Sequence, residues 1–260
     1  MRSFNKNHEP AELLAFKEKL KKAEFPPANT FEALKDDEDA LIPTQLSLAD
    51  ELGWVCVYCQ SALKEYTNNQ NRKRVIIEIE HYKPKSIFKG VINASDKNDL
   101  LCDKSKKFRA DLRIEYANLL GACGQNGHCG NAKRDMEFYH IPNPATTRNR
   151  DFPIFSYNFK GKIRYKIKDD DDDTIDIDWE LKNILNLNHS RLKDKRTGVW
   201  KGIRTKILTN CKIKKLKNGG NKEVQLVKDL IEMYENKNGK FYQYYDCAIH
   251  LLKREYKDYL

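Results

Sequence analysis

Residues 74–85 read RVIIEIEHYKPK, and this stretch decides how the chain is interpreted. The alternation of apolar and polar side chains from Val75 to Glu80 predicts a β-strand. Glu80 and His81 stand side by side at its end, and Pro84 constrains the chain three residues later. Adjacent side chains on a regular strand face opposite ways. A turn at the strand end is therefore needed if both are to serve one ligand.

Two cysteine pairs flank this stretch. The segment WVCVYCQ contains Cys56 and Cys59, and GACGQNGHCGNAK contains Cys123 and Cys129. Four thiolates can surround a zinc ion in a closed, structural site. A redox role for the first pair would need a thioredoxin-like strand and helix around it, and the sequence has no such pattern there. The 63 residues between the pairs exceed the spacing of a simple zinc ribbon, so the cysteines alone only suggest a structural zinc, and the motifs between them decide whether all four bind one ion.

The motifs together resemble a known family. They comprise the Glu80-His81 dipeptide, a proline three residues after the histidine, Asn118-Leu119 in YANLL, and the two cysteine pairs. This combination resembles the HNH endonucleases, clearly over about residues 50–135. The segments EHYKPKS and ILNLNHSRL, and the opening MR with a proline at position 10, resemble one subgroup. That subgroup is the PtuB nucleases of Septu and retron-linked antiphage systems.

The resemblance implies an α+β fold and a reaction. In this family two strands and a helix form a ββα-metal core, and zinc joins its ends. The implied activity is divalent-metal-dependent cleavage of nucleic acid phosphodiesters, with Mg²⁺, Mn²⁺ or Ni²⁺ as the catalytic metal. By the family pattern His81 is the general base and Glu80 a metal ligand, while Asn118 braces the catalytic loop through backbone hydrogen bonds.

The second ligand of the catalytic metal is less direct, because the sequence departs from the common pattern. Many relatives have His, Asn or Asp directly after the last cysteine, where this chain has Gly130. Asn131 is the first choice for this ligand and His128 the second. Lys85 and Lys133 are expected to contact phosphates.

Composition agrees with a nucleic acid partner. The chain has 260 residues, a formal net charge of +10 and a pI of about 9.1, which favours a polyanion. No apolar run approaches the roughly 18 residues of a membrane span, and the opening MRSFNKNHEP lacks the apolar core of a secretory signal. We expect a cytoplasmic protein without a membrane partner. The resemblance adds an ATPase subunit, PtuA, as a partner, and further a retron reverse transcriptase and its DNA.

Three regions are expected along the chain: an N-terminal helical arm (1–45), the nuclease core (46–140), and a mostly helical C-terminal region with a short hairpin (141–260). Hydrophobic periodicity predicts helices at about 9–24, 43–52, 131–138, 190–209, 224–234 and 241–252, and hairpin strands at 154–159 and 162–167. Residues 86–108 read as an insertion or long loop, and the five aspartates at 169–173 as a solvated loop.

Two alternatives remain open. A zinc-stabilised nucleic-acid-binding module without catalysis would have the same cysteines and the same basic charge, and an RNase would use the same residues on another substrate. The basic stretch 191–217, with eleven Lys and Arg against the single acid Asp194, could follow a phosphate backbone or receive a protein partner.

Overall fold

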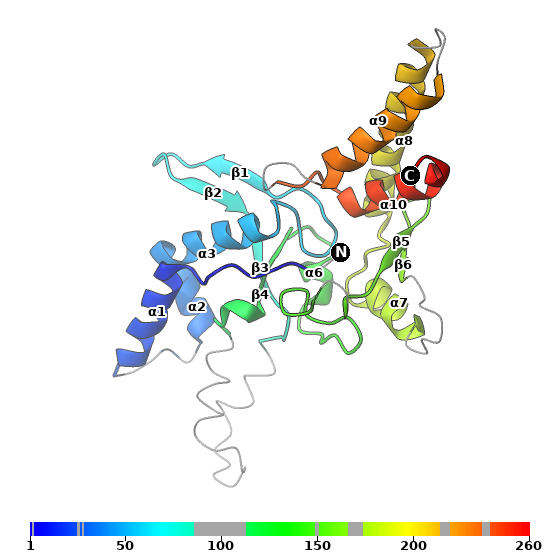
Figure 1. Ribbon diagram of the computed structural model, residues 1–260. Helices are drawn as coiled ribbons and strands as arrows, with labels where there is room; N and C mark the ends of the chain where they lie inside the picture. The colour runs from blue at the N-terminus through cyan, green and yellow to red at the C-terminus, as the bar shows by residue number, and fades with distance from the viewer. Residues whose placement is uncertain are drawn as a thin grey trace.

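The computed structural model describes residues 1, 3–24, 27, 29–85, 113–148, 151–165, 174–213, 219–235 and 240–260. The expected insertion at 86–108 and the aspartates at 169–173 lie outside these residues. The described part is an α+β protein with three small antiparallel sheets of two strands each. Its N-terminal helices lie on one side of the central strands and its C-terminal helices on the other (Figure 1).

Three helices form the N-terminal arm: α1 (Ala11–Lys22), α2 (Thr30–Asp36) and α3 (Glu38–Glu51). The expected start of a helix at Pro43 is wrong, because the carboxylate of Asp37 accepts a hydrogen bond from the amide of Ala40 and caps α3 five residues earlier. The helix α2 was not expected. Apolar side chains of all three helices form one cluster with residues that precede and begin β4, among them Leu13, Phe31, Leu34, Leu48, Ile114 and Leu119.

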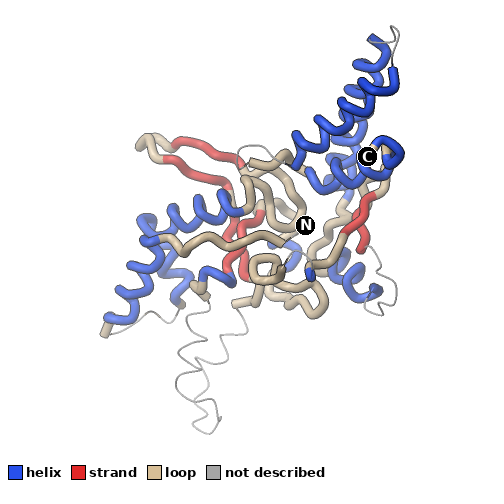
Figure 2. The backbone as a smooth tube through the Cα atoms, in the orientation of Figure 1, coloured by secondary structure: helices blue, strands red, loops and turns tan. Residues whose placement is uncertain are grey.

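The expected strand at 75–80 is two strands. β2 (Lys73–Ile76) pairs with β1 (Lys64–Thr67), and β3 (Glu78–His81) pairs with β4 (Leu119–Ala122). The β1–β2 hairpin extends away from the body, whereas β3 and β4 lie at its centre (Figure 2). Glu80 is opposite Leu120 and His81 is opposite Leu119. A short helical turn, η1 (Tyr116–Asn118), leads into β4.

The helix α6 (Gly130–Lys133) follows the last cysteine of the zinc motif. It ends well before residue 138, which the sequence pattern gave as its end. Arg134 has a positive φ of 49°, a backbone conformation that cannot continue a right-handed helix. The order β3, β4, α6 is nevertheless the expected order of two strands and a helix.

The hairpin and three helices of the C-terminal region were predicted, but the helix at Thr174–Asn183 was not, and the helix expected to start at residue 224 starts at Gly219. The region contains the hairpin β5 (Phe155–Tyr157) and β6 (Ile163–Tyr165), followed by α7 (Thr174–Asn183), α8 (Ser190–Ile213), α9 (Gly219–Glu235), α10 (Tyr245–Glu255) and η3 (Lys257–Tyr259). α8 and α9 lie side by side and project from the body (Figure 1). In the described part of the chain, no helix has both the length and the apolar character needed to cross a membrane.

The main apolar core continues across residue 140. It includes the cysteines and Leu120 from the central region, and Leu185, Trp200, Val227 and Leu252 from the C-terminal region. One buried charged side chain strengthens this connection, and another braces the C-terminal region itself. The Glu180 carboxylate accepts hydrogen bonds from the backbone amides of residues 139–141, and Arg196 donates to the carbonyl oxygens of Gly161 and Leu187.

Candidate functional site

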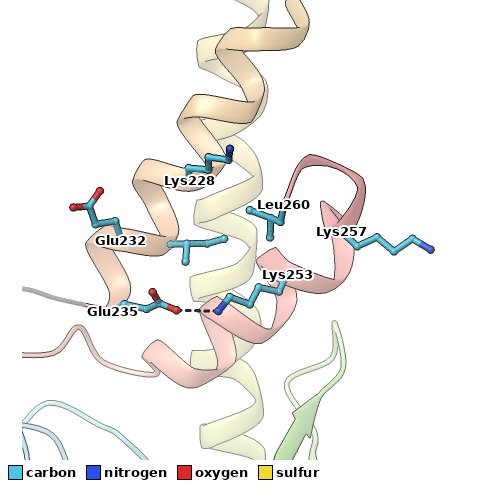
Figure 3. A pocket seen from close by; sticks show the side chains of 7 residues that line it. Lys228, Glu232, Glu235, Lys253, Lys257 and Leu260 are labelled. Atoms are coloured by element: carbon cyan, nitrogen blue, oxygen red, sulfur yellow. Dashed lines mark hydrogen bonds and ion pairs between the residues drawn. The ribbon is translucent and has the colours of Figure 1, made fainter.

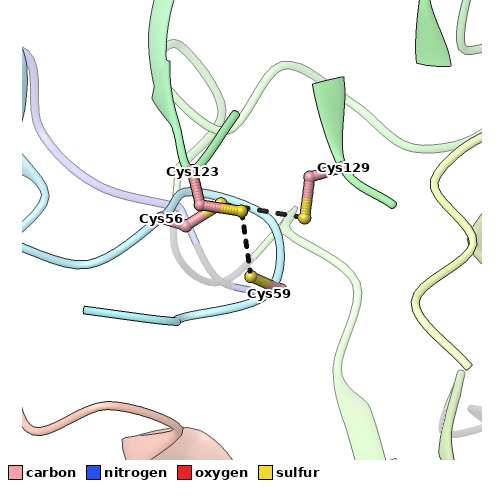
Figure 4. A group of neighbouring side chains, drawn as sticks. All are labelled: Cys56, Cys59, Cys123 and Cys129. Atoms are coloured by element: carbon pink, nitrogen blue, oxygen red, sulfur yellow. Dashed lines mark hydrogen bonds between the residues drawn. The ribbon is translucent and has the colours of Figure 1, made fainter. Parts of the chain in front are cut away.

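The four motif cysteines converge in the core. Cys56 and Cys59 lie in a tight turn closed by a bond from the Gln60 amide to the Cys56 carbonyl oxygen, and the Val57 amide donates to Gly121 of β4. Cys123 follows β4, and Cys129 immediately precedes α6. All four sulfur atoms lie within 4.8 Å of one another (Figure 4). Residues far apart in the sequence therefore form one cluster.

The geometry of this cluster fits zinc. A tetrahedral ion with Zn–S bonds of about 2.3 Å holds its sulfur atoms about 3.8 Å apart. The Sγ atoms of Cys56 and Cys129 are 3.8 Å apart, and so are those of Cys59 and Cys123. All four side chains are buried. The cluster could therefore hold a structural metal such as zinc.

The charges of the cluster also suit a cation. Burial raises the pKa of the Cys56 and Cys129 thiols, while hydrogen bonds from the other cysteines lower the pKa of Cys123. The four buried thiols therefore cannot all lose their protons unless a cation neutralises the thiolates. A divalent cation provides that neutralisation by stabilising the thiolates.

His128 belongs to the cysteine cluster. Its Nδ1 lies 3.2 Å from the sulfur of Cys129 and 4.0 Å from that of Cys123, and its ring is 5.8 Å from the ring of His189. The side chain is buried. These contacts place it beside the thiols instead of beside Glu80, where a ligand of the catalytic metal would be needed.

Glu80 and His81 lie at the end of β3, and both are buried, with 7% and 4% of their surface exposed. His81 Nε2 is 2.7 Å from the carbonyl oxygen of Arg113. Because a carbonyl oxygen can only accept, Nε2 carries the hydrogen, and Nδ1 is the acceptor nitrogen of the neutral ring. The Phe31 ring from α2 meets the imidazole edge to face, with the ring centres 4.5 Å apart. Burial lowers the His81 pKa to about 4.

Lys133 has a different position from the one predicted. Its side chain is fully buried, and its Nζ lies 2.9 Å from Glu80 Oε1 and 2.8 Å from the His81 carbonyl oxygen. Burial raises the Glu80 pKa, and the charge of Lys133 partly offsets this. A buried lysine held in this way cannot reach a phosphate in this conformation. Lys133 therefore has a structural role, because it connects α6 to the end of β3.

Asn118 makes three hydrogen bonds with the backbone of Tyr82 and Lys83. Its Oδ1 accepts from the Lys83 amide at 2.8 Å, its Nδ2 donates to the Lys83 carbonyl oxygen at 3.2 Å, and its own carbonyl oxygen accepts from the Tyr82 amide. The chain just after His81 is therefore fixed to the end of η1, directly before β4. Lys85 is partly exposed, with Nζ 4.5 Å from the centre of the Phe31 ring and 3.8 Å from a Glu32 oxygen.

Asn131 is exposed, and its Oδ1 accepts a hydrogen bond from the Gly127 amide at 3.0 Å. This bond stabilises the cysteine loop and engages the oxygen that was expected to bind metal. Of the two candidates for the second ligand, neither is directed at Glu80.

Glu78 is a third candidate for the second metal ligand, and the sequence patterns did not point to it. A Cβ atom at Gly130 would lie 2.5 Å from Glu80 Oε2 and 3.1 Å from Glu78 Oε2. The two carboxylates therefore lie close to the same point, and a larger residue at 130 would collide with them. Glu78 and Glu80 are two apart on β3 and share one face of the strand. The alternation of residues 78–80, which predicts the strand, also implies that Glu78 and Glu80 lie on the same face of it.

A scan of the chain against models of known protein families gave no match, and a search among curated proteins found no similar sequence.

Proposed function

We propose that the protein is an HNH-type endonuclease that hydrolyses phosphodiester bonds of nucleic acid with a divalent metal. The observation that carries this proposal is the arrangement of β3, β4 and α6. It places the acid–histidine pair at a strand end, beside the helix that follows a four-cysteine cluster. The structural metal of that cluster would be zinc.

His81 is the proposed general base. Its Nε2–H bond to Arg113 orients the ring and leaves Nδ1 to accept a proton from the attacking water. Glu80, with Glu78 in place of Asn131, would hold the divalent metal, which supplies stabilisation of the charge that develops on the phosphate and its leaving oxygen. Asn118 and Lys133 are positioning residues, because they fix the backbone next to His81 and the carboxylate of Glu80.

The buried state of His81 adds a requirement. A base must touch water and phosphate, so the proposed catalysis requires the contact between Phe31 and His81 to open. A nuclease with this property is inactive until something opens that contact. That fits the role that the sequence resemblance suggests, an antiphage effector that works with the ATPase subunit PtuA, and with a retron reverse transcriptase and its DNA as further partners.

A binding module without catalysis is the second candidate. It is favoured by the engagement of Glu80 with Lys133 and by the cover over His81. An RNase with the same site would differ only in substrate.

The deciding experiment incubates the purified protein with plasmid DNA and with total RNA, in Mg²⁺ or Mn²⁺, with and without the products of neighbouring genes. We expect cleavage of one substrate that His81→Ala lowers by about 10² to 10⁴. His140→Ala is the control, because that histidine lies in a separate loop, 3.6 Å from Asp176. Equal turnover of wild type and His81→Ala would refute the assignment of the base. Binding without cleavage under every condition would favour the binding module.

A further inference from the structure

A set of cations surrounds the exposed side of α8, with Arg191, Lys195 and Lys206 on one flank and Lys193, Lys201 and Arg204 on the other. We call it the basic strip, and it consists of six side chains: Arg191, Lys193, Lys195, Lys201, Arg204 and Lys206. Lys193 is partly exposed and the other five are exposed. Asp194 is the single acid within it. This surface plays no part in the proposed chemistry.

The charges of the basic strip are not neutralised by the rest of the described chain, where no carboxylate makes an ion pair with any of the six. Some exposed lysines elsewhere are paired with carboxylates. Lys21 pairs with Glu18 at 2.7 Å and Lys73 with Glu65 at 3.0 Å. On the neighbouring α9 and α10, Lys253 and Glu235 pair at 2.9 Å at the edge of a shallow pocket (Figure 3). The six charges of the basic strip are thus available to an anionic partner.

The basic strip stands on a rigid support. The opposite side of α8 is buried through Leu192, Arg196, Trp200, Ile203 and Ile207. A helix rises about 1.5 Å per residue, so residues 191 to 206 extend over roughly 22 Å. Duplex DNA has a phosphate about every 3.4 Å along each strand. Each flank of the strip is therefore long enough to meet more than one phosphate of a strand.

The helix begins beside the candidate site. The segment just before α8 contacts the second cysteine loop, where Asn186 Nδ2 donates to the Gly127 carbonyl oxygen at 2.7 Å and the Cys129 amide donates to the Leu185 carbonyl oxygen at 2.9 Å. Gly130, which lies against the carboxylate of Glu80, is the next residue. From this point α8 runs outward from the body (Figure 1). A chain lying along the strip would thus approach the site.

We propose that the basic strip binds the phosphate backbone of a nucleic acid and guides it toward the β3–β4 site. This inference rests on the proposed function for the identity of the substrate, but it concerns binding and requires no cleavage. Phosphate contacts release condensed counterions, so each one adds about 0.9 to the slope of log affinity against log salt concentration for duplex DNA.

The test compares two variants that lose the same charge. In the strip variant, Lys195, Lys201, Arg204 and Lys206 become Gln, a residue with good helix propensity. In the control variant, four exposed and ion-paired lysines become Gln: Lys19, Lys21, Lys73 and Lys253. Binding to duplex DNA, single-stranded DNA and duplex RNA is measured over a range of salt concentrations without added divalent metal.

On duplex DNA we expect the strip variant to lower the salt slope by about 3 to 4, and the control variant by less than about 1. The double variants Lys195→Gln/Lys206→Gln and Lys201→Gln/Arg204→Gln should each lower it by about 2, which keeps the test valid if the fourfold change unfolds α8. The nucleic acid whose slope depends on the strip is the one that the strip binds. Equal effects of the strip and control variants, or no effect of either, on all three nucleic acids would overturn the proposal.

The outcomes separate this proposal from the previous one. Strip-dependent binding without cleavage supports the strip and leaves the nuclease assignment without support. Cleavage with a salt slope that the strip variant does not change supports the nuclease and overturns the strip.

Discussion

The cysteine cluster and the Glu80–His81 site are both buried, but their functional atoms are engaged in opposite ways. In the cluster, four sulfur atoms point at one another at distances that suit a single ion. In the site, each group is directed at a different internal partner: Glu80 at Lys133, and His81 at Arg113 and Phe31. The four sulfur atoms are thus arranged like the ligands of one ion. Glu80 and His81 instead already have hydrogen-bond partners inside the protein.

This difference in contacts distinguishes a structural metal site from a catalytic site. A structural metal site has its final geometry in the folded chain, because metal binding and folding are one process. A catalytic site must release its internal contacts before it can act. Four experiments test this contrast, in order of decreasing effect.

The largest effect is expected from Cys56→Ser or Cys129→Ser. Structural zinc binding contributes about 10 to 16 kcal/mol in small domains, so the loss of one ligand should abolish cooperative folding of the core. Zinc content by elemental analysis and thermal unfolding measure this. The control is Cys247→Ala, since Cys247 is buried outside the cluster and should retain one zinc per chain at a cost of about 1 kcal/mol. Folded wild-type protein without zinc would refute the cluster as a zinc site.

Lys133→Met should be the next most damaging change. It leaves the Glu80 carboxylate buried without its cation, which typically costs about 3 to 5 kcal/mol. Denaturant unfolding measures this, and Glu80→Gln in the same chain should recover part of the loss. Lys253→Met removes an exposed ion pair and should cost about 1 kcal/mol or less. Unchanged stability in Lys133→Met would mean that Glu80 is already free for metal.

His81 should make stability depend on pH. The unfolded chain binds a proton at this histidine near pH 6.5, whereas the folded protein does so only near pH 4. Between these values the unfolded state holds more protons, so stability falls as pH falls from 6.5 through 4. The contribution is about 3 kcal/mol. Unfolding of wild type and His81→Gln at several pH values isolates it. Identical pH profiles would show that His81 is exposed in solution.

The smallest effects concern the second metal ligand. Asn131→Ala removes the bond to the Gly127 amide and should cost about 1 kcal/mol of stability without changing the affinity for divalent metal. Glu78→Gln should weaken Mn²⁺ binding by about tenfold or more, measured by calorimetry. If Asn131→Ala weakens Mn²⁺ binding and Glu78→Gln does not, Asn131 is the ligand after all.

Local patterns predicted much of this structure. The helices α8, α9 and α10 follow from hydrophobic periodicity, whereas α7 was not predicted, and the convergence of the four cysteines was expected from the motifs between them and the family resemblance. These features depend on chemistry that each segment carries by itself.

Contacts between residues distant in the sequence could not be predicted from local patterns. An exposed and a buried lysine look alike in a chain, and the partner of Lys133 lies 53 residues earlier. The division of residues 73–81 into two strands depends on which strand each half pairs with. The short helix α2 covers His81 through a contact between residues 31 and 81, which no local pattern encodes.

The strength of the contact between Phe31 and His81 sets the fraction of molecules in which His81 is uncovered. Full burial of a phenylalanine side chain contributes about 1.5 to 3 kcal/mol. If leaving this contact were the only cost of uncovering His81, roughly 0.5 to 10 per cent of molecules would have the base accessible at any moment. A ligand that binds only those molecules would lose the same factor in apparent affinity. Phe31→Ala would remove that factor, so under the proposed function the cleavage by the protein alone would rise toward its activated value.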